Sequence, residues 1–469
     1  MTFDVTDKRV TVAGAARSGM AAAELLARRG ARVTLSETRA DVPAAEPLRA
    51  LGVQLELGGH RAATFTGADL IVLSPGVPPE QPVIAAARAQ GVPVIAEIEL
   101  ASRWLRGRVI AITGTKGKST TTALTGRILE TAGFKVTVGG NIGLPLSAQV
   151  RASTPDTLHV VETSSFQLEQ IDTFHPWIAV VLNFSPDHLD RHPTVEAYGA
   201  AKARIFENQQ VGDWAVVNAD DPSVLEMVRR ARAKAATRFF ARRTHRQDGT
   251  VIENGWIVDR HANQDVSTRL VPLSAIHLLG PHLVDDVMAA ATVGAIAGAA
   301  PAAMTAAVDS FRGLEHAMEL VGEIHGVRFV NDSKATNVES ALRSIESFDS
   351  GLVPIIGGRF KGGDLRQLRR PLQSRAKAVV AIGEARPLVR EALDGAVEVE
   401  EAATLKDAVD RAYAIAKPSG VVLLAPACAS FDMFTDYAER GRAFKEQVSR
   451  LAGTKDQEPG TWAEGPNEW

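Results

Sequence analysis

Residues 112–120 read ITGTKGKST, the segment of this chain whose residue types and spacing most clearly suggest a chemical task. A glycine-rich turn between a strand and a helix exposes backbone N–H groups and the positive end of the helix, which together bind phosphate. Lys118 would reach the β- and γ-phosphates of a nucleotide, and Ser119 would hold Mg²⁺. The strict P-loop pattern begins with glycine where this chain has Ile112, so the match is to a shortened variant that starts at Gly114.

Three further polar residues in the middle of the chain could serve the same chemistry. Glu162 follows the apolar run LHVV and could ligate Mg²⁺ beside Ser119, although an acid that caps the next helix fits equally well. His188, in NFSPDHLD, is a candidate ligand or substrate contact, against the alternative of an ordinary turn histidine. Lys202 lies on a predicted helix, where a lysine by itself usually points to solvent.

A second polar group occupies the last third of the chain. Residues 331–337, NDSKATN, follow the apolar run RFV and contain hardly an apolar side chain, so we expect them to bind a ligand rather than form core. The same argument applies to residues 359–363, RFKGG, and to Ser430 in PACASFD. These segments would bring hydrogen-bond donors to a crevice in which an anionic amino acid could lie.

A third candidate site is the turn of residues 14–19, which follows the apolar run RVTVA near the start of the chain. An acid, Glu37, lies about 20 residues beyond it, at the distance at which dinucleotide-binding folds place their ribose contact. The glycine spacing alone is a weak signal, so NAD and other nucleotides both remain possible ligands of this turn.

All these candidate sites follow strands, and three blocks of alternating strand and helix patterns predict an α/β fold with mostly parallel sheets. The first block, residues 1–107, is a small doubly wound, Rossmann-like unit. The second, residues 108–312, holds the P-loop in a mostly parallel sheet, and the third, residues 313–452, is again Rossmann-like. Residues 453–469 have little apolar surface to bury and are expected to be disordered.

Composition restricts the class of protein. A chain of 469 residues suggests three domains of about 150 residues each. The net charge of -3, without a basic run, argues against nucleic acid or an anionic membrane as the partner. The single cysteine, Cys428, excludes an intrachain disulfide and suits a reducing compartment. The N-terminus is no signal peptide, and residues 288–307 are expected to form a buried helix, so we expect a cytoplasmic protein.

Seven motifs, in this order, resemble those of the Mur ligase family, and in particular of its D-glutamate-adding members. They are GTKGKST, GGNIGLP, ETSSFQLE, NFSPDHLDRH, AYGAAKARIFE, NDSKATN and PACASFDMFTDYAERGRAF, and the resemblance extends from residue 9 to about residue 445. It implies an enzyme of peptidoglycan precursor synthesis with an N-terminal UDP-binding domain, a central P-loop ATPase and a C-terminal amino-acid-binding domain. We expect this enzyme to be a monomer.

The reaction that the resemblance implies uses ATP and Mg²⁺. The γ-phosphate of ATP passes to the carboxylate of UDP-N-acetylmuramoyl-L-alanine, and the amine of D-glutamate then displaces phosphate from the acyl phosphate. Mg²⁺ and cationic side chains offset the charge of the anions that are brought together. Both substrates are small molecules, and neither nucleic acid nor a membrane is an expected partner.

Residue by residue, the resemblance implies the following roles. The catalytic residues are Lys118, His188 and Lys202, and Lys202 is a carbamate. The metal ligands are Ser119, Glu162, His188 and the carbamate of Lys202. The ATP contacts are Gly114, Thr115, Lys116, Gly117, Lys118, Ser119, Thr120, Asp332 and Lys334. The contacts to the UDP-substrate are Gly14, Ala15, Ser18, Glu37, Thr38, Arg39, Asn141 and Ser164. The D-glutamate contacts are Thr336, Lys361, Ser430 and Tyr437.

Three positions depart from the family pattern, all on the nucleotide side. The motif HNxxN becomes HLVDD, so that Leu283 and Asp286 replace two asparagines near adenine, and Ala317 replaces an arginine after His316. These replacements bear on ATP affinity and leave the other two sites unaffected. Three alternatives therefore remain: a turnover-deficient nucleotide-sugar-binding regulator, an NAD-dependent oxidoreductase, and a Mur-type ligase for another amino acid.

Overall fold

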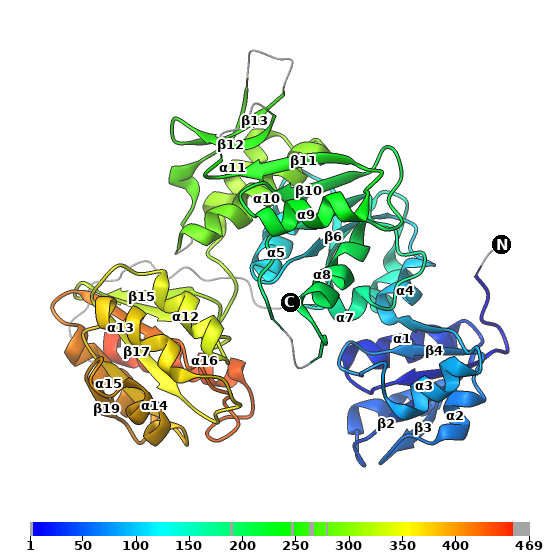
Figure 1. Cartoon of the computed structure of the whole chain (residues 1–469), viewed down its shortest axis with the longest axis horizontal. Helices are drawn as coiled ribbons and strands as arrows, with labels where there is room; N and C mark the ends of the chain where they lie inside the picture. Colours follow the sequence, from blue (N-terminus) through cyan, green and yellow to red (C-terminus); the bar gives the residue numbers. More distant parts are fainter. Residues whose placement is uncertain (1–2, 188–190, 245–247, 262–266, 278–279, 454–469) are drawn as a thin grey trace. The chain divides into compact units, whose positions relative to one another are not determined.

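A computed structural model describes residues 3–187, 191–244, 248–261, 267–277 and 280–453 of the chain. Their strands form three sheets, which are mostly parallel and carry helices between the strands (Figure 1). The predicted α/β class with mostly parallel sheets is thereby confirmed. The described residues divide into two compact units, one of residues 3–276 and 284–310 and the other of residues 277–283 and 311–453.

The first sheet of the larger unit has the strand order β3-β2-β1-β4-β5, and neighbouring strands within it are all parallel. Its strands are β1 (Arg9–Ala13), β2 (Arg32–Glu37), β3 (Gln54–Leu57), β4 (Leu70–Leu73) and β5 (Val94–Ala96). Its helices are α1 (Arg17–Arg28), α2 (Ala62–Thr66), α3 (Pro82–Ala89) and α4 (Glu97–Ser102). The chain leaves β1 toward β2 on one side and later returns on the other side as β4. This reversal opens a crevice at the carboxyl ends of β1 and β4, where such folds bind ligands.

The second sheet of the larger unit has the order β14-β13-β12-β11-β10-β9-β6-β8-β7. Its strands are β6 (Arg108–Thr113), β7 (Lys135–Gly140), β8 (Thr157–Glu162), β9 (Ile178–Val181), β10 (Trp214–Asn218), β11 (Ala236–Ala241), β12 (Gly249–Glu253), β13 (Trp256–Arg260) and β14 (Thr268–Pro272). The strands from β7 to β12 pair in parallel, and β13 and β14 add an antiparallel edge. Because β6 lies between β8 and β9, the loops after these three strands meet at one edge.

The helices of this second sheet are α5 (Lys118–Thr131), α6 (Leu146–Gln149), α7 (Ser165–Leu168), α8 (Val195–Ala203), α9 (Pro222–Ala231), α10 (Pro281–Ala297) and α11 (Pro301–Ser310). The expected single helix over residues 288–307 is wrong, because the chain breaks between α10 and α11. Gly298 has φ +84°, a left-handed conformation that ends α10, and Pro301 begins α11, where its missing N–H costs nothing.

The sheet of the smaller unit has the order β15-β16-β20-β17-β18-β19, in which only β15 is antiparallel to its neighbour. Its strands are β15 (Glu319–Ile324), β16 (Val327–Asn331), β17 (Leu352–Gly357), β18 (Val379–Ile382), β19 (Val399–Glu401) and β20 (Gly420–Leu424). Its helices are α12 (Val338–Glu346), α13 (Arg369–Arg375), α14 (Arg386–Leu393), α15 (Leu405–Ala416) and α16 (Tyr437–Gly453).

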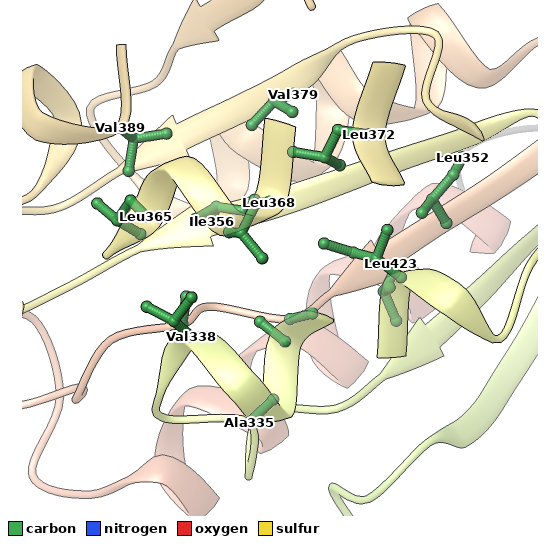
Figure 2. Close-up of a cluster of buried hydrophobic side chains, with 14 of the residues drawn as sticks. Ala335, Val338, Leu352, Ile356, Leu365, Leu368, Leu372, Val379, Val389 and Leu423 are labelled. Carbon is green, nitrogen blue, oxygen red and sulfur yellow. The ribbon is translucent and has the colours of Figure 1, made fainter. Parts of the chain in front are cut away.

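Apolar side chains fill both faces of this sheet. On one face, Val338 of α12 and Leu372 of α13 pack with Ile356 of β17 and Leu423 of β20 (Figure 2). On the other, Phe444 of α16 belongs to a second buried cluster with residues of α15. Because these strands are buried on both faces, polar residues are left to the loops at their ends. The loops after β16, β17 and β20 share one edge because the three strands are parallel neighbours. No helix of the described residues is long and apolar enough to cross a membrane.

Candidate functional site

The turn between β6 and α5 has the backbone of an anion-binding loop. Gly114 has φ +156° and Gly117 has φ +80°. Residues other than glycine rarely adopt these backbone conformations. Gly117 precedes the first turn of α5, which holds Lys118, Ser119 and Thr120 and has no side-chain cap. The positive end of α5 can therefore favour an anion at this loop.

Asn183, just after β9, holds the loop in shape. Its Oδ1 accepts hydrogen bonds from the N–H groups of Thr115 at 3.1 Å and Lys116 at 2.9 Å, and its Nδ2 donates to the carbonyl of Lys116 at 3.1 Å. The Nζ of Lys118 donates to the carbonyl of Thr115 at 2.9 Å. Sequence reasoning gave Asn183 no role, and its place in the motif NFSPDH was the only available signal.

Lys202, on α8, lies inside the protein beside the same loop. Its side chain is only 1% exposed, and its Nζ donates to the carbonyl of Gly114 at 2.8 Å and lies 4.7 Å from the centre of the Tyr198 ring. Burial, followed by the nearby charge of Lys118, lowers the pKa of Lys202 well below its usual range. The interpretation of this lysine as a solvated helix residue is therefore wrong, because its amine is buried against the carbonyl of Gly114 in the loop after β6.

Glu162 ends β8 next to the loop and is 2% exposed. Its Oε1 accepts a hydrogen bond from Asn141 Nδ2 at 2.8 Å, while its buried Oε2 has no hydrogen-bond partner among the described residues. The cap of α7 is Ser164, which forms a capping box with Gln167, so the alternative role of Glu162 as a helix cap is wrong. A buried carboxylate oxygen without a donor suits a cation as its partner.

The predicted metal ligand His188 lies outside the described residues. Near it in sequence, Asp187 forms an ion pair with Lys116 at 3.7 Å. Within the part of the chain that the structure describes, no three His, Cys, Asp or Glu side chains are grouped as a protein-only metal site requires. A metal ion held partly by phosphate oxygens needs fewer protein ligands, and the buried Oε2 of Glu162 fits such an ion.

The crevice of the first sheet opens into a cavity of about 470 Å³. Its lining includes the predicted residues Gly14, Ser18, Glu37, Thr38 and Asn141, which come from two sheets of the same unit. The lining also includes residues that the sequence analysis did not assign to a site, namely Arg17, His60, Ser74, Pro75, Gly76 and Gln81. Arg17 lies in the turn of residues 14–19, and Ser74, Pro75 and Gly76 follow β4 at the crevice, whereas His60 and Gln81 carried no sequence signal.

Glu37 organises the backbone at the mouth of this cavity. Its Oε2 accepts a hydrogen bond from the N–H of Ala15 at 2.8 Å, and its Oε1 accepts from the N–H groups of Thr38 at 2.9 Å and Arg39 at 3.1 Å. Partial burial opposes the charge, but these N–H groups and the Arg39 guanidinium outweigh it and lower the pKa of Glu37 to about 2. The carboxylate is thus ionised at neutral pH, as a contact to ribose hydroxyls requires.

Asp286, one of the departures from the family pattern, packs directly on the phosphate loop. A Cβ added to Gly117 would lie 2.2 Å from its Oδ1, and the side chain is 3% exposed. Burial, with a contribution from Asp285, raises the pKa of Asp286 well above its usual range. Asp285 itself accepts a hydrogen bond from Arg242 Nε at 2.8 Å. Leu283 is buried.

In the smaller unit, the other predicted nucleotide contacts follow β16. The Oδ1 of Asp332 accepts a hydrogen bond from the N–H of Met318 at 3.2 Å, and the N–H of Lys334 donates to the carbonyl of His316 at 3.0 Å. These two bonds connect the loop after β16 to the segment that contains Ala317. Ala317 carries no group that could replace the arginine of the family pattern.

The predicted amino-acid contacts all lie at the carboxyl-terminal edge of the same sheet. Thr336 follows β16, Lys361 follows β17, Ser430 follows β20, and Tyr437 begins α16. Ser430 is buried, whereas Lys361 and Tyr437 are exposed. The strands β16, β20 and β17 are neighbours in this order, so their loops adjoin one another. Arg440, whose buried guanidinium contacts two of these loops, was missed because AERGRAF reads as an ordinary helix.

Three family models match successive parts of the chain. They are the Mur ligase MurD-like N-terminal domain over residues 8–96, the Mur ligase middle domain over residues 112–294, and the Mur ligase glutamate ligase domain over residues 316–428. The chain belongs to the Mur ligase family. Membership confirms the predicted class of enzyme, an amide-forming ligase of peptidoglycan precursor synthesis, and leaves the NAD interpretation of the first turn without support.

Two relatives of this Mur ligase match it over nearly their whole length. The UDP-N-acetylmuramoylalanine–D-glutamate ligase of Acidobacterium capsulatum is 47% identical over 95% of this chain and 97% of the relative. That of Koribacter versatilis is 44% identical over 96% of this chain and 99% of the relative.

Solved structures of more distant family members share the fold. The UDP-N-acetylmuramate-alanine ligase MurC of Thermotoga maritima has a TM-score of 0.59 at 18% identity, over 96% of this chain and all of the other. The MurF ligase of Thermotoga maritima in complex with ADP has a TM-score of 0.58 at 16% identity, over 95% of this chain and 96% of the other.

Proposed function

We propose that this Mur ligase joins the carboxylate of UDP-N-acetylmuramoyl-L-alanine to the amine of D-glutamate at the expense of ATP. The observation that carries the proposal is the match, at 44–47% identity over nearly the whole chain, to relatives named for this reaction. The polar edge of the smaller unit supports it further, because Lys361, Ser430 and Thr336 suit an amino acid with two anionic ends.

The proposed reaction takes place in two steps, phosphoryl transfer and then amide formation. A carboxylate oxygen of the first substrate attacks the γ-phosphorus of ATP, which forms the acyl phosphate and releases ADP. The amine of D-glutamate then attacks the acyl carbon, the C–O bond to phosphate breaks, and the amine loses a proton as the amide forms. In the first step, Lys118 and the positive end of α5 stabilise the negative charge on the transferring phosphoryl group.

The remaining nucleotide contacts are proposed from the family resemblance. The backbone of residues 114–117 and the first turn of α5 would bind the phosphates, and Asp332 and Lys334 are proposed as further nucleotide contacts. Mg²⁺ would be held by Ser119, Glu162, His188 and the modified Lys202, and it would supply positive charge to the phosphate oxygens. The unpartnered Oε2 of Glu162 supports this ligand set.

Lys202 is proposed to carry a carbamate. Its amine is buried and has a lowered pKa, which favours the neutral form that can attack carbon dioxide. The new N–C bond forms as the nitrogen loses a proton, and the product is an anionic carbamate in place of an ammonium group. This exchange of sign turns a residue that repels a metal ion into a residue that can ligate it.

The UDP-substrate is proposed to occupy the cavity of about 470 Å³. Glu37, Thr38 and Arg39 would contact uridine, and Gly14, Ala15 and Ser18 would contact diphosphate at the start of α1. Asn141 and Ser164 would contact the muramoyl part. We further propose that the enzyme acts in the cytoplasm as a monomer, with domains over residues 1–107, 108–312 and 313–452. Size-exclusion chromatography with light scattering tests the monomer, and limited proteolysis tests the domain boundaries.

Turnover with a panel of amino acids tests the proposed function. With UDP-N-acetylmuramoyl-L-alanine and ATP, D-glutamate should be consumed, and ADP, phosphate and the new amide should appear in equal amounts. L-glutamate and meso-diaminopimelate should not react. Comparable turnover of a diamino acid would favour a ligase for another amino acid, and binding of the UDP-substrate without turnover would favour a regulatory protein.

A further inference from the structure

Arg440, on α16, is one of the largest fully buried side chains of the protein and is 1% exposed. Its guanidinium donates three hydrogen bonds to uncharged oxygens. Nε donates to Ser333 Oγ at 3.0 Å, Nη2 to the carbonyl of Ser333 at 2.9 Å, and Nη1 to the carbonyl of Cys428 at 3.2 Å. A buried arginine usually pairs with a carboxylate, but no carboxylate of the described residues forms an ion pair with Arg440.

These bonds join the segments that carry the predicted amino-acid contacts. Ser333 lies in residues 331–337 with Thr336, and Cys428 lies two residues before Ser430. The Oγ of Ser333 also donates to the carbonyl of Tyr437 at 2.7 Å. One guanidinium, together with the hydroxyl it contacts, therefore connects the loops after β16 and β20 to the start of α16.

The fourth contact, Lys361, is attached to the same framework. The N–H of Arg359 donates to the carbonyl of Ala429 at 2.9 Å, and the N–H of Ala429 donates to the carbonyl of Arg359 at 3.0 Å. Lys361 follows Arg359 by two residues and is close enough to Cys428 to affect its thiol electrostatically. A shift of the Cys428 segment would thus move Ser430 and Lys361 together.

The charge of Arg440 is costly where it lies. Burial lowers the pKa of Arg440 to about 10, which still leaves the guanidinium protonated at neutral pH. The carbonyl and hydroxyl oxygens, together with the nearby charge of Asp432, compensate only part of the lost hydration of this buried cation, because burial remains the largest effect on its pKa. An anion that binds nearby, in a region of low dielectric constant, would gain from this remaining positive potential.

We propose that Arg440 is a positioning residue of the amino-acid site, which sets the spacing of the loops after β16 and β20 and favours an amino acid with two carboxylates. The inference rests on the proposed function for the identity of that amino acid, D-glutamate. Arg440 acts through Ser333, Cys428 and its electric field, without contact to the substrate.

The test is steady-state kinetics of the full chain with Arg440→Met, Arg440→Lys and Arg440→Ala, with Arg411→Met as a matched control. Arg411 lies on α15 of the same unit, where it is exposed and pairs with Asp407 at 2.9 Å. Arg440→Met should raise the KM for D-glutamate at least about tenfold, the effect expected if the displaced loops lose one charge-assisted hydrogen bond to the substrate. The KM values for ATP and UDP-N-acetylmuramoyl-L-alanine should change less than about twofold, well below that tenfold step.

Two further measurements separate charge and positioning from a general loss of structure. Arg440→Lys keeps the charge but not the forked geometry, so its KM for D-glutamate should lie between those of the wild type and Arg440→Met. Low millimolar guanidinium chloride should lower the KM of Arg440→Ala for D-glutamate, whereas sodium chloride of the same ionic strength should not. If Arg440→Met fails to fold, Arg440→Lys and the rescue experiment decide the matter.

An equal rise in the KM for all three substrates, or wild-type kinetics of Arg440→Met, would overturn the role of Arg440. So would the absence of rescue together with identical kinetics of the Lys and Met variants. Failure of the proposed function is a different result, because the wild type itself would then form no amide with D-glutamate. In that case the KM of the same variants is measured for the amino acid that the wild type accepts. A rise in the KM for a cationic or apolar amino acid would contradict the charge argument.

Discussion

Lys118 and Lys202 interact with different carbonyls of the phosphate loop. Lys118 donates to Thr115, and Lys202 donates to Gly114 from inside the protein. Since Lys202 is nearly inaccessible, it cannot follow a moving phosphate, whereas Lys118 stands at the open start of α5. The two lysines therefore suit different tasks, contact with the γ-phosphate for Lys118 and support of a metal ion for Lys202.

Lys118→Ala should abolish phosphate release and leave binding of the UDP-substrate nearly intact, because the cavity proposed for that substrate does not include Lys118. Phosphate release and calorimetric binding of the UDP-substrate measure the two effects. Lys135→Ala, which removes an exposed lysine of β7, is the control. If the variant kept more than about a tenth of wild-type turnover, a loss below about 1.4 kcal/mol, Lys118 would not be the γ-phosphate contact.

Lys202→Ala should be nearly inactive, and short carboxylic acids such as acetate should restore part of the activity because they replace the carbamate. The measurement is turnover as a function of acetate concentration, with Lys118→Ala as the control that acetate should not rescue. A mass spectrum and a metal-loaded structure that both show an unmodified Lys202 would contradict the carbamate.

Asp286→Asn should be more stable than the wild type at pH 8, and its advantage should shrink as pH falls toward the ordinary carboxyl pKa of 3.8. Since the pKa of Asp286 is raised in the folded protein, the folded state holds a proton that the unfolded state has lost. The wild type therefore loses stability as pH rises from the ordinary carboxyl pKa toward the folded pKa. Thermal unfolding from pH 5 to pH 8 tests this expectation, and parallel curves for both proteins would contradict it.

At the scale of helices and strands, the sequence predicted the part of the fold that positions the site. Apolar runs such as Leu158–Val161 and Val353–Ile356 indicated buried parallel strands, and the polar residues after them marked the correct edge of each sheet. The broken helix over residues 288–307 was missed because its alanines continue the helical composition across Gly298. The role of Asn183 was missed because a hydrogen bond between distant loops has no local pattern.

The helices α4 and α6 connect the two sheets of the larger unit through a buried carboxyl group. The Oε1 of Glu97, at the start of α4, accepts a hydrogen bond from the N–H of Ser147 in α6 at 2.6 Å. Burial raises the pKa of Glu97 to about 7, although the hydrogen bond from Ser147 opposes the shift. The carboxyl group is therefore partly protonated at neutral pH.

Glu97→Gln should remove a pH dependence of stability between about pH 4.5 and pH 7. Because the folded pKa is raised, the wild type loses stability as pH rises through this window, by at most on the order of 3 kcal/mol. The variant should be the more stable protein at pH 8. Thermal unfolding at several pH values gives the comparison, and Glu24→Gln, at an exposed residue paired with Arg28, should show no such change. Equal pH dependence of all three proteins would refute the assignment.

At the scale of the whole molecule, the sites belong to separate compact units. The phosphate loop and the cavity of about 470 Å³ lie in the larger unit, and the four predicted amino-acid contacts lie in the smaller one. Sequence patterns located each group of residues within its own sheet. They could not reveal buried links such as Arg440, because these depend on which loops meet in space.

Calorimetry should resolve two thermal transitions, since each unit has its own buried core. UDP-N-acetylmuramoyl-L-alanine should raise the midpoint of the larger unit's transition and leave the other nearly unchanged, because a ligand stabilises only the state that binds it. A single transition that the ligand shifts as a whole would show that the two units unfold together.

The division into two units also makes the protein spectroscopically asymmetric. Trp104, Trp177, Trp214 and Trp256 all lie in the larger unit, and residues 311–453 contain no tryptophan. With Trp462 and Trp469 changed to phenylalanine, indole emission would report on the larger unit alone, and the smaller unit would be visible only through Tyr413 and Tyr437. A tryptophan introduced at Phe431, an exposed side chain beside Ser430, would then give the proposed amino-acid site its own optical signal.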